Sequence, residues 1–278
     1  MLRILNDSLA VLCDPNGSGL TIVDQQRGTR WNLDKKTQVW GVEPRADLER
    51  PTGAPAVKPL IPVSAEAHDN RLTIQYQAGD IPLSVIYTLN PEGLQVTLPG
   101  ELPAEIGYVA LPGSFAPAHE PLSLLLPIMQ GMFWDGKGPA HSILRGEAGH
   151  LGFSMPFLGY LGQSGGLLVA AETQDDLLWW MGKDEGDRFW AANLQTSSLG
   201  SMRYDLMVRI YPCDADIVAI ARQYRKKVIQ DRRFISWQEK IAQRPYLEWL
   251  FGALMCFVGY CQDNLDYAAE SRKLKAYG

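Results

Sequence analysis

Cysteine and histidine are scarce in this sequence, with four residues of each among 278. Neither occurs at a CxxC, HxH or HExxH spacing, so the sequence predicts no metal site and no cofactor. Four cysteines in a chain of this length do not form a disulfide framework. The sequence has no glycine-rich phosphate loop between a strand and a helix. Residues 162–166 match the GxSxG spacing, but they fall in a Gln-Ser-Gly-Gly turn predicted between two strands and not in the strand-to-helix turn of a nucleophile elbow.

Long apolar runs and concentrated basic charge are missing as well. No run of about 18 apolar residues occurs, and the N-terminal stretch before Asp7 is too short for a signal peptide. The formal net charge is −5, with no basic stripe, which argues against nucleic acid or a membrane surface as a partner. We therefore expect a cytoplasmic protein.

Short strand-like segments dominate the sequence up to about residue 212. Residues 71–78 alternate strictly, with Leu72, Ile74 and Tyr76 on one face. Pro91-Glu92-Gly93 predicts a tight turn between two further strands. About twelve to fourteen such strands with frequent turns predict a mainly β chain with a large antiparallel β-sandwich.

Helical periodicity begins at Asp214. Residues 214–231 place Ile220 and Tyr224 on one helix face, and Ser236 with Glu239 forms a capping box that predicts a second helix.

An apolar run from residue 250 to 260, followed by a helical stretch at 265–277, predicts one βα unit of a parallel barrel. Such a unit needs parallel neighbours. We therefore predict a β-sandwich over 1–212, a helical linker over 213–246, and over 247–278 the start of a truncated (β/α)8 barrel.

Two pairs of residues are candidates for binding a substrate. Trp134 and Asp135 combine an aromatic face and a carboxylate, as sugar sites do, although we favour Trp134 as a packing residue and Asp135 as a turn cap. Tyr260 and Asp263 follow the predicted barrel strand, where barrels build their sites, but Asp263 also suits a turn or a helix N-cap. Glycosidase carboxylates usually come from several later strands, so no catalytic residue is assigned.

Trp179 and Trp180 are adjacent in a predicted strand and therefore point to opposite faces. One belongs to the core. For the other we favour an interface with the barrel over a ligand platform.

Four segments resemble a known group of enzymes: LLLPIMQGMFW, MPFLGYLGQSGGLLVAAETQDD, RYDLMVRIYPCDADIVAIARQYRKKV and EKIAQRPYLEWLFGA. They are similar to retaining glycoside hydrolases of the α-galactosidase-like and endo-α-N-acetylgalactosaminidase-like kinds, in particular uncharacterised bacterial members. The third segment joins the last sandwich strand to a helix that contains Ala221, Tyr224 and Arg225. The resemblance implies a galactose mutarotase-like supersandwich, a short helical linker and a catalytic barrel.

The resemblance further implies that the chain is the N-terminal, largely non-catalytic portion of a carbohydrate-active glycoside hydrolase. It would pack on, and shape the cleft of, a barrel domain missing from this chain, and its partners would be carbohydrate and that barrel. One alternative is an aldose-mutarotase-like epimerase, in which His119, His141 or His150 faces a carboxylate. The other is a carbohydrate-binding module without catalysis.

Overall fold

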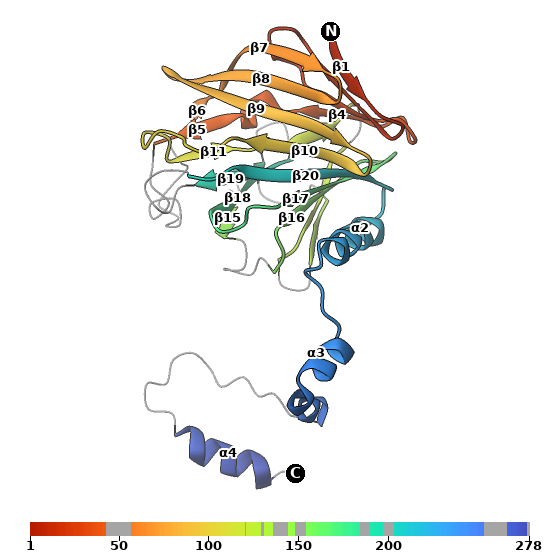
Figure 1. The fold of residues 1–278 in the computed structure, drawn as a ribbon, viewed down its shortest axis with the longest axis vertical. Helices are drawn as coiled ribbons and strands as arrows, with labels where there is room; N and C mark the ends of the chain where they lie inside the picture. The colour runs from red at the N-terminus through yellow and green to blue at the C-terminus, as the bar shows by residue number, and fades with distance from the viewer. Residues whose placement is uncertain are drawn as a thin grey trace. The chain divides into compact units, whose positions relative to one another are not determined.

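The computed structural model describes residues 1–42, 57–119, 121–128, 131–135, 144–147, 154–183, 189–196, 203–252 and 266–276. The chain is mainly β and divides into two compact units, Met1–Gln230 and Asp231–Gly278. Figure 1 shows the strands and helices of both units.

The strands of the first unit form three antiparallel sheets within the described residues. In spatial order, the five-stranded sheet contains β1 (Leu2–Leu5), β2 (Leu9–Cys13), β3 (Thr21–Asp24), β4 (Arg30–Leu33) and β12 (Phe115–Pro117). The nine-stranded sheet contains β14 (Met132–Trp134), β13 (Ser123–Leu126), β16 (Phe157–Leu161), β17 (Gly166–Ala171), β20 (Leu206–Cys213), β10 (Gly93–Leu98), β9 (Ile81–Asn90), β8 (Arg71–Ala78) and β7 (Ile61–His68). The six-stranded sheet contains β15 (Leu144–Glu147), β18 (Leu177–Lys183), β19 (Phe189–Thr196), β11 (Tyr108–Ala110), β5 (Val39–Gly41) and β6 (Lys58–Pro59). A short 3-10 helix, η1 (Lys35–Thr37), precedes β5.

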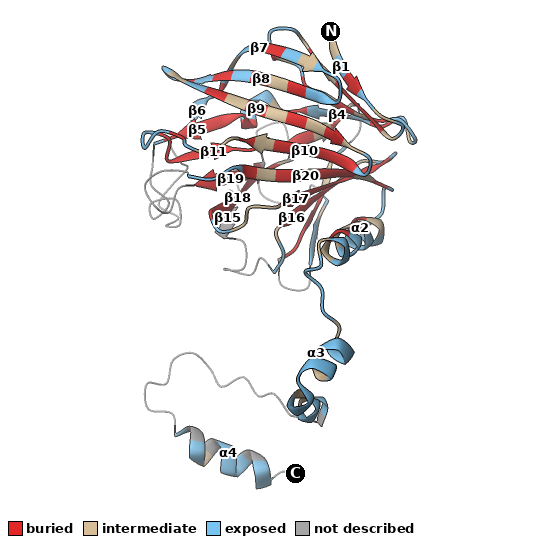
Figure 2. Ribbon diagram, in the orientation of Figure 1, coloured by how far each residue is buried: buried red, intermediate tan, exposed pale blue. Residues whose placement is uncertain are grey.

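The main hydrophobic core draws side chains from all three sheets, which gives the first unit a sandwich-like interior. Trp31 comes from β4, Val96 from β10 and Trp179 from β18, and each is completely buried. Burial alternates along β8 as its sequence predicts, and Figure 2 shows this alternation on the ribbon. The period-two pattern therefore fixes which face of each strand enters the core.

The hairpin predicted at Pro91-Glu92-Gly93 is confirmed, because Asn90 of β9 pairs with Gly93 of β10. The described chain nevertheless has twenty strands, more than the sequence predicts. Several of them, such as β5, β6 and β11, have only two or three residues, which is too few to produce a recognisable alternation.

Strand β7 is the last strand of the nine-stranded sheet. Its pairing with β8 shifts register between Pro62 and Ser64, which marks a β-bulge. The backbone N–H of Ala65 donates to the carbonyl oxygen of Pro15 at 2.9 Å. A turn of the five-stranded sheet therefore covers part of this edge.

Helix α2 (Ile217–Gln230) packs on the nine-stranded sheet, over the face that points away from the main core. Ile220 is fully buried there, in a second cluster with Leu168 and Tyr211, and the ring of Tyr224 lies 4.6 Å from that of Phe157. The helix begins after Asp216, whose carboxylate accepts the N–H of Ala219 at 3.1 Å. Although the predicted linker contains α2, the helix belongs to the first compact unit.

The second unit contains α3 (Trp237–Gln243), the 3-10 helix η2 (Pro245–Gly252) and α4 (Tyr267–Ala276). The predicted capping box is confirmed, since the Ser236 side chain accepts from the N–H of Glu239 and the Glu239 carboxylate from that of Ser236. No helix among the described residues is long and apolar enough to cross a membrane.

The strand predicted over residues 250–260 is wrong at its start, because Leu250, Phe251 and Gly252 lie in η2. A short apolar run does not distinguish strand from helix, and Pro245 has a backbone φ suited to the first turn of a helix. Residues 253–260 lie outside the described structure, so the barrel unit stays a prediction.

Candidate functional site

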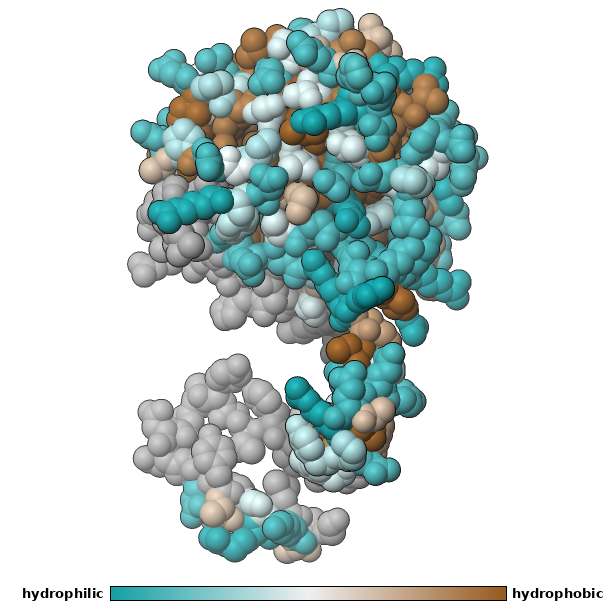
Figure 3. Space-filling model, in the orientation of Figure 1, coloured by the Kyte–Doolittle hydropathy of each residue, from teal (hydrophilic) through white to brown (hydrophobic). Residues whose placement is uncertain are grey.

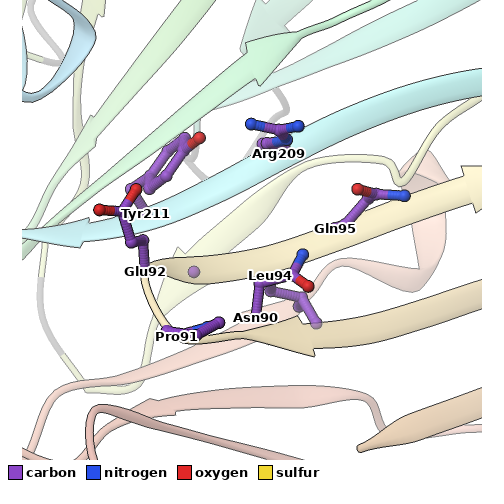
Figure 4. A pocket seen from close by; sticks show the side chains of 8 residues that line it. Asn90, Pro91, Glu92, Leu94, Gln95, Arg209 and Tyr211 are labelled. Atoms are coloured by element: carbon purple, nitrogen blue, oxygen red, sulfur yellow. The ribbon is translucent and has the colours of Figure 1, made fainter. Parts of the chain in front are cut away.

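A pocket of about 490 Å³ lies on the outer face of the nine-stranded sheet, and its volume is in the range of small-molecule sites. Its walls come from the β9–β10 hairpin and from β20, as the close-up in Figure 4 shows. The lining residues are Asn90, Pro91, Glu92, Gly93, Leu94, Gln95, Arg209 and Tyr211.

The polar lining follows from strand alternation. Val96 of β10 and Val208 of β20 point into the main core, so their neighbours Gln95 and Arg209 point outward. Gln95 and Arg209 are also direct partners in the β10–β20 register. Hydrophilic side chains predominate over the face of the molecule shown in Figure 3.

An ion triad of two buried side chains and the partly exposed Arg209 lies beside the pocket. Lys227 Nζ lies 2.7 Å from Glu172 Oε1, and Arg209 Nε lies 3.4 Å from the same oxygen. The side chains of Lys227 and Glu172 are only 4% and 9% exposed. A carboxylate so buried is tolerable only when it is paired, and here it fixes Arg209 at the pocket wall. The sequence offered one signal of this contact, since Lys227 follows Ile220 and Tyr224 at helical spacing.

Glu92 is held from the last turn of α2. Gln230 Nε2 donates to Glu92 Oε1 at 2.9 Å, and Lys226 Nζ lies 3.6 Å from the same carboxylate oxygen. Across the pocket, Gln95 Nε2 donates to Thr97 Oγ1 at 3.2 Å. The pocket thus combines a carboxylate, a guanidinium and two carboxamides, which together can donate to and accept from hydroxyl groups.

The structure places the four predicted substrate-binding residues as follows. Trp134 ends β14, pairs with Leu124 and packs, partly buried, against the main core. Asp135 follows it and is exposed. Neither lines the pocket described above. Tyr260 and Asp263 lie outside the described residues.

The prediction that Trp179 and Trp180 point to opposite faces is confirmed. Trp179 is in the main core, whereas Trp180 is in a separate cluster on the other face of the six-stranded sheet. The Trp180 ring packs edge-on against Trp190, with centroids 4.4 Å apart.

A second depression, of about 430 Å³, is lined by His119 together with Asp34, Lys35 and Lys36. Asp34 is the N-cap of η1 and accepts the N–H of Lys36. His119 is exposed, with a φ of 65°, and follows β12 rather than standing on a strand. His141 and His150 lie outside the described residues. Within the described ranges, no group of three or more His, Cys, Asp or Glu residues is placed to hold a metal ion.

A mainly β, sandwich-like fold of this kind occurs in a glycoside hydrolase of known structure. The enzyme is the α-N-acetylgalactosaminidase NagBb from Bifidobacterium bifidum. Its quadruple mutant aligns with a TM-score of 0.72 and 16% identity over 99% of this chain and 49% of that chain. Its complex with GalNAc aligns with a TM-score of 0.68 and 14% identity over 89% of this chain and 41% of that chain. No family model and no curated protein matches the chain.

The protein therefore spans less than half of the length of NagBb. At this level of sequence identity the likeness concerns the fold.

Proposed function

We propose that this protein is the largely non-catalytic portion of a carbohydrate-active glycoside hydrolase. It packs on a catalytic barrel carried elsewhere in the same polypeptide and shapes the substrate cleft of that barrel. The observation that carries the proposal is the alignment with NagBb, which takes in 99% of this chain but only 49% of the enzyme. Carbohydrate and the barrel are the partners that this role requires.

The surface of the second unit supports the assignment of a protein partner. Tyr246, Trp249 and Phe251 of η2 are 65%, 66% and 66% exposed. The ring of Phe251 lies 5.9 Å from that of Trp237, which is itself 47% exposed. Grouped exposed aromatic side chains are typical of surfaces that bind another protein surface. We assign this aromatic face to the contact with the barrel.

The chemistry of the pocket supports binding rather than cleavage. Hydrolysis of a glycosidic bond usually requires two carboxylates, one on each side of the scissile bond. Glu92 is the only carboxylate among the described lining residues of the pocket, and its oxygen is engaged by Gln230 and Lys226. These residues therefore supply no acid–base pair.

Two assays on the 278-residue protein test the proposal. We expect no hydrolysis of aryl α-N-acetylgalactosaminide or aryl α-galactoside and no mutarotation of galactose above the buffer rate. Hydrolysis by this chain alone would overturn the proposal. Mutarotation that is lost in His119→Asn would instead establish the epimerase alternative, because His119 and Asp34 line one depression.

A positive test uses the natural coding sequence. The polypeptide that includes the region encoded after residue 278 is expected to hydrolyse one of these glycosides. Its activity or stability should fall in Trp249→Ser and Phe251→Ser, which remove the aromatic face. A downstream sequence that lacks a βα repeat pattern would contradict the assignment.

A further inference from the structure

We propose that the pocket between the β9–β10 hairpin and β20 binds one ring of a neutral carbohydrate, as a non-catalytic subsite. The inference deepens the proposed function and relies on it for the choice of carbohydrate among polyhydroxyl ligands. The position of the site, its charge and its donor–acceptor pattern come from the described residues.

The walls of the pocket are held in place from outside the pocket. On one side, Gln230 and Lys226 of α2 fix Glu92, at 2.9 and 3.6 Å. On the other side, Glu172 holds Arg209 at 3.4 Å and is anchored in turn by the buried Lys227 at 2.7 Å. Side chains fixed before the ligand arrives lose less conformational freedom on binding. The wall that carries Arg209 is therefore the better preformed side of the pocket, because the Lys226–Glu92 pair on the other side is about half exposed.

The lining favours a neutral ligand. Glu92 and Arg209 are its two charged lining residues in the described structure, and their charges cancel. An anionic ligand would be attracted by Arg209 but repelled by Glu92. A cationic ligand would be attracted by Glu92 but repelled by Arg209. A neutral ligand gains from both residues without either penalty.

The hydrogen-bonding pattern favours hydroxyl groups. An ionised carboxylate only accepts, a guanidinium only donates, and carboxamides such as Asn90 and Gln95 do both. A sugar ring presents adjacent hydroxyls, each of which can donate and accept, so it matches this mixed set. Pro91 supplies apolar surface for the C–H groups of the ring, whereas the Leu94 side chain is buried in the main core.

The affinity should be low. Tyr211, the aromatic residue of the lining, is only 4% exposed, so it offers little surface for stacking on a ring. At the binding efficiency usual for small ligands, a single pyranose is expected to bind with a Kd on the order of 1–10 mM.

The chain offers a matched pair of variants. Gln95 and Gln75 both point outward from the nine-stranded sheet, and each amide donates to a neighbouring hydroxyl at 3.2 Å, that of Thr97 or Ser84. Gln95 lines the pocket, whereas Gln75 lies on β8, outside the lining. Gln95→Ala should weaken binding about fivefold, the effect of one lost hydrogen bond, and Gln75→Ala should leave it unchanged.

The experiment is a saturation-transfer NMR titration of the 278-residue protein. The neutral probes are galactose, N-acetylgalactosamine and glucose, and the anionic probe is glucuronate. Thermal unfolding of both variants confirms that they fold. We expect a signal for at least one neutral sugar, weaker binding by Gln95→Ala alone, and weaker binding of glucuronate than of its neutral counterpart, glucose.

Three results would overturn the inference. These are no saturation transfer from any probe at about 50 mM, equal binding by the two variants, or tighter binding of glucuronate than of glucose. None of these three results would contradict the proposed function, which is tested by the hydrolysis assays and by the downstream sequence. Conversely, hydrolysis by this chain alone would overturn the proposed function and leave the measured occupancy of the pocket standing.

Discussion

Adjacent lysines of α2 allow a direct measurement of what holds this helix to the sheet. Lys227 and Lys226 each form an ion pair with a glutamate. The Lys227–Glu172 pair is buried, with side chains 4% and 9% exposed, whereas the Lys226–Glu92 pair is 55% and 50% exposed. Replacing each lysine by methionine removes the charge and keeps most of the apolar stem. The two variants therefore differ mainly in the burial of the glutamate that loses its partner, Glu172 or Glu92.

The expected losses of stability are well separated. Removing one partner of a buried ion pair costs about 3–5 kcal/mol, because the other charge is left uncompensated. Arg209 lies 3.4 Å from the same Glu172 oxygen and keeps part of that compensation, so we expect Lys227→Met to lose about 2–3 kcal/mol. Exposed pairs contribute about 0–1 kcal/mol, so Lys226→Met should stay within that range.

The assay is urea unfolding, followed by tryptophan fluorescence and circular dichroism. A second variant, Glu172→Leu combined with Lys227→Met, removes both buried charges of the pair and should recover most of the loss. Equal losses for the two single variants, or a gain in stability for Lys227→Met, would refute the reasoning that the buried Lys227–Glu172 pair helps to hold α2 on the sheet.

Three further predictions concern buried polar groups of the first unit. Tyr76→Phe removes the hydroxyl that accepts a hydrogen bond from Gln38 Nε2 at 2.8 Å. The variant should lower the free energy of unfolding by about 1–3 kcal/mol, and a loss below about 0.5 kcal/mol would contradict the prediction. Gln195→Met should raise the free energy of unfolding by about 1 kcal/mol. Gln195 is 0% exposed, and its amide has no hydrogen-bond partner in the described structure, so the buried polar group is destabilising. A lower free energy of unfolding in this variant would contradict the prediction. Burial raises the pKa of Cys13 to about 11 and that of Cys213 to about 12. The test uses a Cys256→Ser, Cys261→Ser variant, in which Cys13 and Cys213 are the remaining cysteines. Both thiols should react slowly with iodoacetamide at pH 8 and faster as the pH rises toward their pKa values. A reaction rate that does not change with pH would refute the prediction.

Features that depend on a few adjacent residues could be predicted from the sequence. The hairpin at Pro91-Glu92 needs only a turn between two alternating segments, and the start of α3 needs only Ser236 and Glu239 at their spacing. The opposite faces of Trp179 and Trp180 follow from the geometry of a strand alone.

Features that depend on distant pairing could not be predicted. The pocket brings Gln95 beside Arg209 only because β10 pairs with β20, and nothing in either strand specifies that partner. The division of the strands among three sheets has the same origin. The apolar run that starts at Leu250 predicts a strand, but its first residues lie in η2, because a short apolar run fits a strand and a helix equally well.

The irregular edge at β7 also affects how the molecule behaves at high concentration. An open edge strand offers its backbone groups to a second chain and so invites aggregation. Here Pro62 has no N–H to donate, the bulge beside it breaks the regular spacing, and the carbonyl of Pro15 already occupies the N–H of Ala65. These features oppose the stacking of one copy on another through this edge, although Ile61 and Val63 are more than half exposed there.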